Sequence, residues 1–157
     1  MSVNFYHTAN NPRDLSSTVG GAISSTGYTG YLSELFVYVD SPPSGSQSAL
    51  NQYRKLHIKN DDNVTYTGVK VWLYGIEHPD QVSIGLEASA SQTISSATGS
   101  PPTSVTFSAP TDYINGLDVG SLAPGQSTGI WLKVTLSGIT DPDKYATFSV
   151  TVGFYDI

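Results

Sequence analysis

The sequence contains no cysteine, few charged residues and no long apolar segment. Without cysteine, the chain of 157 residues can form neither a disulfide framework nor a thiolate zinc site. Only 13% of the residues are charged, so Ser, Thr, Asn, Gln and Gly must supply most of the polar surface. No apolar run approaches the ~20 residues that a membrane-spanning helix needs, and we therefore expect no membrane insertion.

The charge balance is acidic. Seven basic against thirteen acidic residues give a net charge of −6, which argues against nucleic-acid binding, because phosphate contacts need clustered Lys and Arg. The densest basic group is Arg54, Lys55 and Lys59, and we predict that it forms a solvated strand face. The first residues, MSVNFYHTANNPRD, lack the basic start and apolar core of a secretory signal, so we expect synthesis in the cytoplasm.

Alternation of apolar and polar residues predicts an all-β fold. Leu56 and Ile58 alternate with polar residues in YRKLHIKN, and the same period of two recurs in VKVWLYG, VSIGL, GIWLKVTL and YATFSVTVGF. The turn-forming clusters NDDN, LAPGQS and TDPD separate these segments. We therefore predict a two-sheet antiparallel β-sandwich with either an Ig-like or a jelly-roll-like strand order.

The N-terminal part of the chain has a different character. The stretch SSTVGGAISSTGYTG is rich in small and turn-forming residues, and only the run Leu35–Val39 indicates an early strand. We therefore predict an extended N-terminal arm over residues 1–33 and a β-sandwich domain over residues 34–157. An arm of this kind cannot bury itself, so deletion of residues 1–30 should leave the sandwich folded.

No arrangement of residues predicts catalysis, because a nucleophile needs a base within hydrogen-bonding reach. The pattern places the three histidines in the arm, on a polar strand face and in a turn: His7, His57 and His78, respectively. The acidic pairs Asp61/Asp62 and Asp141/Asp143 lie in predicted turns, where turn chemistry explains them. Calcium binding is the alternative for these pairs, although neither has the spacing of an EF-hand. We expect no enzyme activity, no metal and no cofactor.

Aromatic residues are the remaining candidates for binding. Among ten Tyr and two Trp, both Trp72 and Trp131 fall on the face opposite the aliphatic stripe of their strands. On a sandwich this face is solvent or a partner surface, and large exposed aromatics anchor interfaces or stack on sugars. The alternative is that a loop or the arm covers each of them.

The order of several motifs resembles a set of small virion-associated proteins of tailed bacteriophages. The motifs are YRKLHIKN, TGVKVWL, VTFSAP and LAPGQSTGIWLKVT, and the resemblance runs from about Leu35 to Val152. It implies an Ig-like or jelly-roll-like domain of the virion that decorates or cements a capsid, or is attached to the tail. It also implies contacts with the major capsid protein or other virion proteins, and it supplies no catalytic residue.

Extended arms let particle proteins bind neighbouring subunits, which is compatible with this resemblance. The predicted anchors of the arm are apolar or aromatic: Phe5, Tyr6, Val19 and Ile23. The leading hypothesis is therefore a non-enzymatic capsid decoration protein that works as a homo-oligomer, with a trimer favoured. The alternative is a glycan- or receptor-binding β module that uses Trp72 and Trp131 as stacking platforms.

Overall fold

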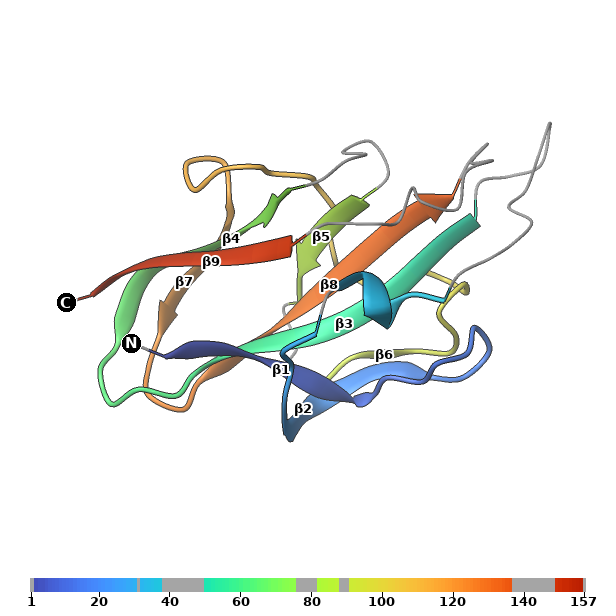
Figure 1. Ribbon diagram of the computed structural model, residues 1–157, viewed down its shortest axis with the longest axis horizontal. Helices are drawn as coiled ribbons and strands as arrows, with labels where there is room; N and C mark the ends of the chain where they lie inside the picture. The colour runs from blue at the N-terminus through green and yellow to red at the C-terminus, as the bar shows by residue number, and fades with distance from the viewer. Residues whose placement is uncertain are drawn as a thin grey trace.

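The computed structural model describes residues 2–30, 32–37, 50–75, 82–87, 91–136 and 149–156. These residues form strands and one short 3-10 helix (Figure 1). The elements are β1 (Val3–Asn10), β2 (Val19–Gly27), η1 (Leu32–Leu35), β3 (Leu50–Asn60), β4 (Tyr66–Tyr74), β5 (Val82–Leu86), β6 (Thr93–Ile94), β7 (Leu117–Leu122), β8 (Ser127–Leu136) and β9 (Ser149–Asp156). The predicted all-β class is confirmed.

The strands form two antiparallel sheets. One sheet has six strands in the order β5-β8-β3-β1-β2-β6, and the other has three in the order β7-β4-β9 (Figure 1). The run β1-β3-β8-β5 matches the A-B-E-D order of an immunoglobulin sandwich, and the pair β4-β9 matches strands C and F. Strands β2 and β6 extend the larger sheet beyond β1, while β7 lies along the other edge of β4. The described strands therefore form a two-sheet antiparallel β-sandwich.

The central core lies between the two sheets and follows the predicted alternation. Leu56 and Ile58 of β3 are at most 1% exposed, as is Leu132 of β8. From the opposite sheet, Val71 and Leu73 of β4 are fully buried. Each of these strands presents its aliphatic stripe to the other sheet, because successive side chains of a strand point to opposite faces.

Part of the outer face of the six-stranded sheet is also buried. Val19, Tyr53 and Trp131 pack there with Ile94 and Ala97 in a second apolar cluster. The segment around the two-residue strand β6 supplies Ile94 and Ala97. The larger sheet therefore has an apolar cluster on each side, and the sequence pattern predicted only the central one.

The predicted extended arm is wrong, because its residues are strands of the sandwich. Strand β1 pairs with β3 from Val3↔Asn60 to His7↔Leu56, and β2 pairs with β1. Gly20 and Gly21, which lie in the stretch of small residues assigned to the arm, are buried with φ of +103° and +100°. Such φ values favour glycine, and the tight packing at Gly20 leaves no room for a side chain.

The remaining predicted elements have mixed outcomes. The turn LAPGQS is confirmed, with the N–H of Gln126 donating to the carbonyl of Ala123 at 2.9 Å. Leu35, expected to begin a strand, ends the 3-10 helix η1 and packs into the central core. The rest of that apolar run from residue 38, together with His78, Asp141 and Asp143, lies outside the described residues.

Candidate functional site

The outer face of the three-stranded sheet carries the largest exposed aromatic group among the described residues. Lys70, Trp72 and Tyr74 alternate with the core positions of β4 and therefore point away from the core. Tyr74 is 68% exposed, and Trp72 is partly buried. Trp72 lies over Gly153 of β9. A Cβ atom added at Gly153 would be only 2.5 Å from Cη2 of Trp72. The absence of a side chain at Gly153 thus lets the indole lie flat on the sheet.

A loop before β7 completes this surface. The rings of Tyr113 and Trp72 meet edge to face, with centroids 5.8 Å apart and an interplanar angle of 86°. The Tyr113 hydroxyl donates to the carbonyl of Gly68 at 2.8 Å, while the Lys70 ammonium lies 5.2 Å from the Tyr113 ring centroid. The Lys70 ammonium also donates to the Ile114 carbonyl at 3.1 Å. These contacts hold the loop against the sheet.

Ile114 is 82% exposed at the tip of this loop. We call Lys70, Trp72, Tyr74, Tyr113 and Ile114 the aromatic face. Trp72 and Tyr113 are fixed by their mutual contact and by the Tyr113 hydrogen bond, so these two side chains would lose little conformational freedom on binding. Surfaces of this type are used for protein interfaces or for stacking on sugars.

Sequence reasoning identified only part of the aromatic face. Trp72 was predicted as a partner-binding residue, and the structure places it on this face. Tyr74 has the same alternation in VKVWLY and could have been found in the same way. Tyr113 and Ile114 lie in a loop, and no sequence period connects them with β4.

Trp131 does not lie on an exposed face, as we had expected for a partner-binding residue. Its side chain is 0% exposed in the second cluster. A Cβ at Gly20 of β2 would lie 2.9 Å from Cη2 of Trp131, which shows how closely β2 approaches the indole. The alternative of cover by a loop or by the N-terminal segment is therefore correct for this residue.

The predicted arm anchors are distributed over the six-stranded sheet. Phe5 packs against the central core, and Val19 is fully buried in the second cluster. The hydroxyl of Tyr6 donates to the Asp61 carboxylate at 2.6 Å, which ties β1 to the turn after β3. Ile23 is partly buried opposite Thr8. None of these residues belongs to the aromatic face.

Lys55 is buried, although the alternation predicted a solvated position. Its ammonium forms an ion pair with Glu87 and donates to the Gly21 carbonyl at 2.9 Å, and both charged side chains are 0% exposed. The ammonium also lies 5.4 Å from the Trp131 ring centroid. Burial lowers the pKa of Lys55, and Glu87 opposes that shift. An ion pair enclosed in this way has a structural role, since no substrate can reach it.

Arg54 and His57 are buried as well, which also contradicts the prediction of a solvated basic strand. The Arg54 guanidinium donates to the carbonyls of Pro12 at 2.7 Å and Asp14 at 3.1 Å, so it joins β3 to the loop between β1 and β2. Burial, with a further contribution from Lys55, lowers the pKa of His57 to about 4. His57 is 0% exposed and is therefore inaccessible as a general base.

The described carboxylates after β3 are bound by neighbouring side chains. Asp61 accepts from Asn4 and Tyr6 and forms an ion pair with Lys59 at 2.7 Å, and these groups lower its pKa to about 2. Asp62 accepts from the hydroxyl of Tyr66 at 2.8 Å. Within the part of the chain that the structure describes, no three or more His, Asp and Glu residues gather in a way that could hold a metal.

No family model matches the chain, and no curated protein or solved structure shows significant similarity to it. In the described residues no helix has the length and apolar character needed to cross a membrane.

Proposed function

We propose that this protein is a non-enzymatic structural protein of a tailed-phage virion that decorates or cements the capsid. The aromatic face carries the proposal, because Tyr74 and Ile114 are exposed there and Trp72 packs against Tyr113. Only three large hydrophobic residues of the described chain are exposed, and two of them lie on this face. A concentration of exposed apolar groups on one face is typical of a protein interface.

The contact partner of the aromatic face is a second copy of the chain. Strands β7 and β9 are the edges of the three-stranded sheet and flank β4, which carries Trp72 and Tyr74. An edge strand offers unpaired backbone groups to another chain, and the aromatic side chains add apolar area to the same contact. Each Å² of apolar surface buried there contributes about 25 cal/mol before the ordering costs of association.

Low surface charge favours the same assembly. Only 13% of the residues are charged, and Arg54, Lys55 and Glu87 are buried inside the sandwich. Lys70 lies opposite Asp118 of β7 and near Asp112, so opposite charges would balance where copies associate. A homo-oligomer, with a trimer favoured, would then bind the major capsid protein, in agreement with the resemblance of the sequence motifs to virion-associated proteins.

The test combines light scattering of the purified protein with co-sedimentation on undecorated capsids of the cognate phage. We expect a trimer or larger oligomer that pellets with the capsids. The double variant Tyr74→Ser/Ile114→Ser removes two apolar side chains from the contact and should weaken self-association at least about tenfold. Because both side chains are exposed, the variant should keep its melting temperature.

Val64→Ser is the matched control, since Val64 is 38% exposed but lies in the turn between β3 and β4. This variant should keep both its mass and its pelleting. An unchanged mass for the double variant would exclude the aromatic face as the contact between copies. A wild-type monomer that stays in the supernatant would refute the decoration function itself.

A further inference from the structure

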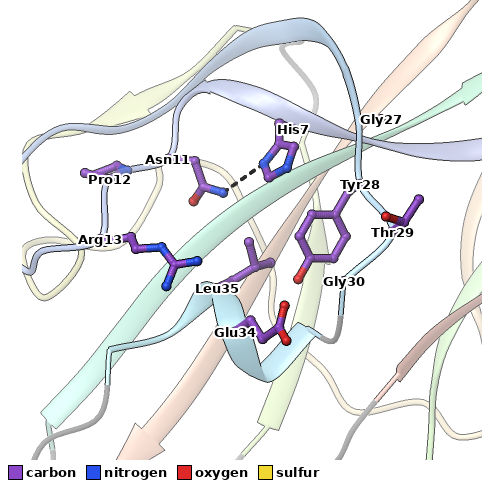
Figure 2. A pocket seen from close by; sticks show the side chains of 10 residues that line it. All are labelled: His7, Asn11, Pro12, Arg13, Gly27, Tyr28, Thr29, Gly30, Glu34 and Leu35. Carbon is purple, nitrogen blue, oxygen red and sulfur yellow. Dashed lines mark hydrogen bonds between the residues drawn. The ribbon is translucent and has the colours of Figure 1, made fainter.

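A polar pocket lies beside strands β1 and β2 of the six-stranded sheet, whereas the aromatic face lies on the three-stranded sheet. It has a volume of about 250 Å³ and lies between the end of β1, the end of β2 and the helix η1 (Figure 2). The side chains that define its chemistry are those of His7, Asn11, Arg13, Tyr28 and Glu34. The buried Leu35 lies beneath them.

The aromatic rings and Asn11 form one wall of the pocket. His7 and Tyr28 meet edge to face, with ring centroids 5.0 Å apart and an interplanar angle of 80°. The amide nitrogen of Asn11 lies 3.3 Å from Nδ1 of His7, which orients the Asn11 side chain. Its carbonyl oxygen Oδ1 is buried and has no hydrogen-bond partner within the described residues. Because this atom is shielded from solvent, a ligand hydroxyl could donate to it only after the Asn11 side chain turns toward the pocket.

Two opposite charges face the pocket. Figure 2 shows the Arg13 guanidinium and the Glu34 carboxylate on different sides of it, and neither forms a hydrogen bond or an ion pair with another described side chain. Burial raises the pKa of Tyr28 to about 12, with the Glu34 carboxylate adding to the shift and Arg13 opposing it. The Tyr28 hydroxyl therefore stays protonated and experiences both charges.

These groups set the chemistry of a fitting ligand. Arg13 can only donate, whereas the Glu34 carboxylate and Oδ1 of Asn11 can only accept. The two charges balance, so a ligand that carries a single charge and is attracted by one residue would be repelled by the other. A hydroxyl both donates and accepts, so a ring with several hydroxyls can accept from Arg13 and donate to Glu34 while an apolar face packs on Tyr28.

We propose that this pocket binds a neutral saccharide residue. The site goes beyond the structural role of the protein, because none of its side chains belongs to the aromatic face. A virion protein with such a site could assemble through one surface and contact a glycan through another. Loss of sugar binding would leave self-association unchanged, so the two proposals can fail separately.

The experiment is a titration of the ¹⁵N-labelled full chain with glucose, galactose, mannose and N-acetylglucosamine, followed by amide chemical shifts. We expect saturable shifts for at least one sugar, centred on His7, Asn11 and Tyr28. Arg13→Met and Glu34→Gln each remove a charge-assisted hydrogen bond and should raise the Kd at least about tenfold. Both side chains are exposed, so neither variant should unfold the protein.

Lys70→Met is the matched control, because it removes a partly exposed cation from the aromatic face and should leave the Kd unchanged. Saturable shifts centred on Trp72 instead would assign sugar binding to the aromatic face and overturn the proposal. If free glycine binds saturably at the pocket and no sugar competes with it, the pocket binds a zwitterion and the saccharide proposal is wrong. The absence of saturable shifts with every sugar would also refute the site.

Discussion

His57 is the described residue whose protonation couples most directly to folding. It lies on the covered face of β3, where its Nε2 atom is 3.3 Å from the carbonyl of Gly21. Lys55 occupies the same face two positions earlier, and Glu87 pairs with Lys55. Burial is the main reason that the pKa of His57 falls to about 4, and protonation would also place a second positive charge next to the buried ammonium of Lys55.

We predict that the free energy of unfolding decreases as the pH falls from about 6.5 to about 4. In this window the unfolded chain protonates His57 and the folded protein does not, so protons favour the unfolded state. The full effect is about 3 kcal/mol, because each pKa unit corresponds to about 1.4 kcal/mol. Urea unfolding at a series of pH values measures it.

The variant His57→Gln provides the comparison for this prediction. It has no titrating ring but keeps a polar side chain that can reach the Gly21 carbonyl. Carboxylates titrate equally in both proteins, so the difference between the two pH profiles isolates His57. Parallel profiles between pH 4 and 6.5 would contradict the low pKa.

At the scale of elements, strands β1 and β2 decide whether the sandwich can form. Strand β1 pairs with the central strand β3, and β2 covers Trp131 and Lys55. We therefore predict that deletion of residues 1–30 prevents folding, whereas deletion of a peripheral arm would leave the sandwich folded. The deletion removes the strand that pairs with β3 and the segment that covers the charge of Lys55. The free-energy cost of these losses exceeds the roughly 5–15 kcal/mol of net stability typical of a domain. Far-UV circular dichroism and amide dispersion would detect the unfolded chain.

A pair of glycine variants tests the same elements without a deletion. At Gly20 a Cβ would lie 2.6 Å from the Gln92 carbonyl oxygen and φ is +103°, so Gly20→Ala should lower the melting temperature strongly. At Gly27, near the other end of β2, the nearest atom is 3.8 Å away, so Gly27→Ala should be tolerated. A truncated protein that folds, or equal melting temperatures for the two variants, would show that β2 is peripheral.

The element scale also shows how far sequence reasoning could reach. Alternation correctly predicted the inward stripes of β3, β4 and β8, because those residues repeat with the period of the pleat. The segment of β2 was misread, since VGGAISSTG has the composition of a flexible loop. Its two buried glycines are required by close packing against Gln92 and neighbouring strands, which composition alone does not reveal.

At the scale of the whole molecule, charge limits the range of partners. The chain has a net charge of −6, and two of its seven basic residues, Arg54 and Lys55, are fully buried. The other four cations among the described residues lie on different elements, whereas phosphate contacts need clustered Lys and Arg: Arg13 follows β1, Lys59 is in β3, Lys70 in β4 and Lys133 in β8. We predict no binding to fluorescent duplex DNA in anisotropy measurements at low salt, where a basic control protein binds. Salt-dependent binding by this protein would contradict the prediction.

The sequence by itself determined the all-β class, the strands of the central core and the turn at Ala123–Gln126. These features depend on residues that are close together in the sequence. The alternation of apolar and polar residues with a period of two indicates that each strand has two distinct faces. Only the tertiary structure decided what lies on the second face. Distant segments cover Trp131, Lys55 and His57 there, while Trp72 remains at the surface, and such contacts leave no local pattern.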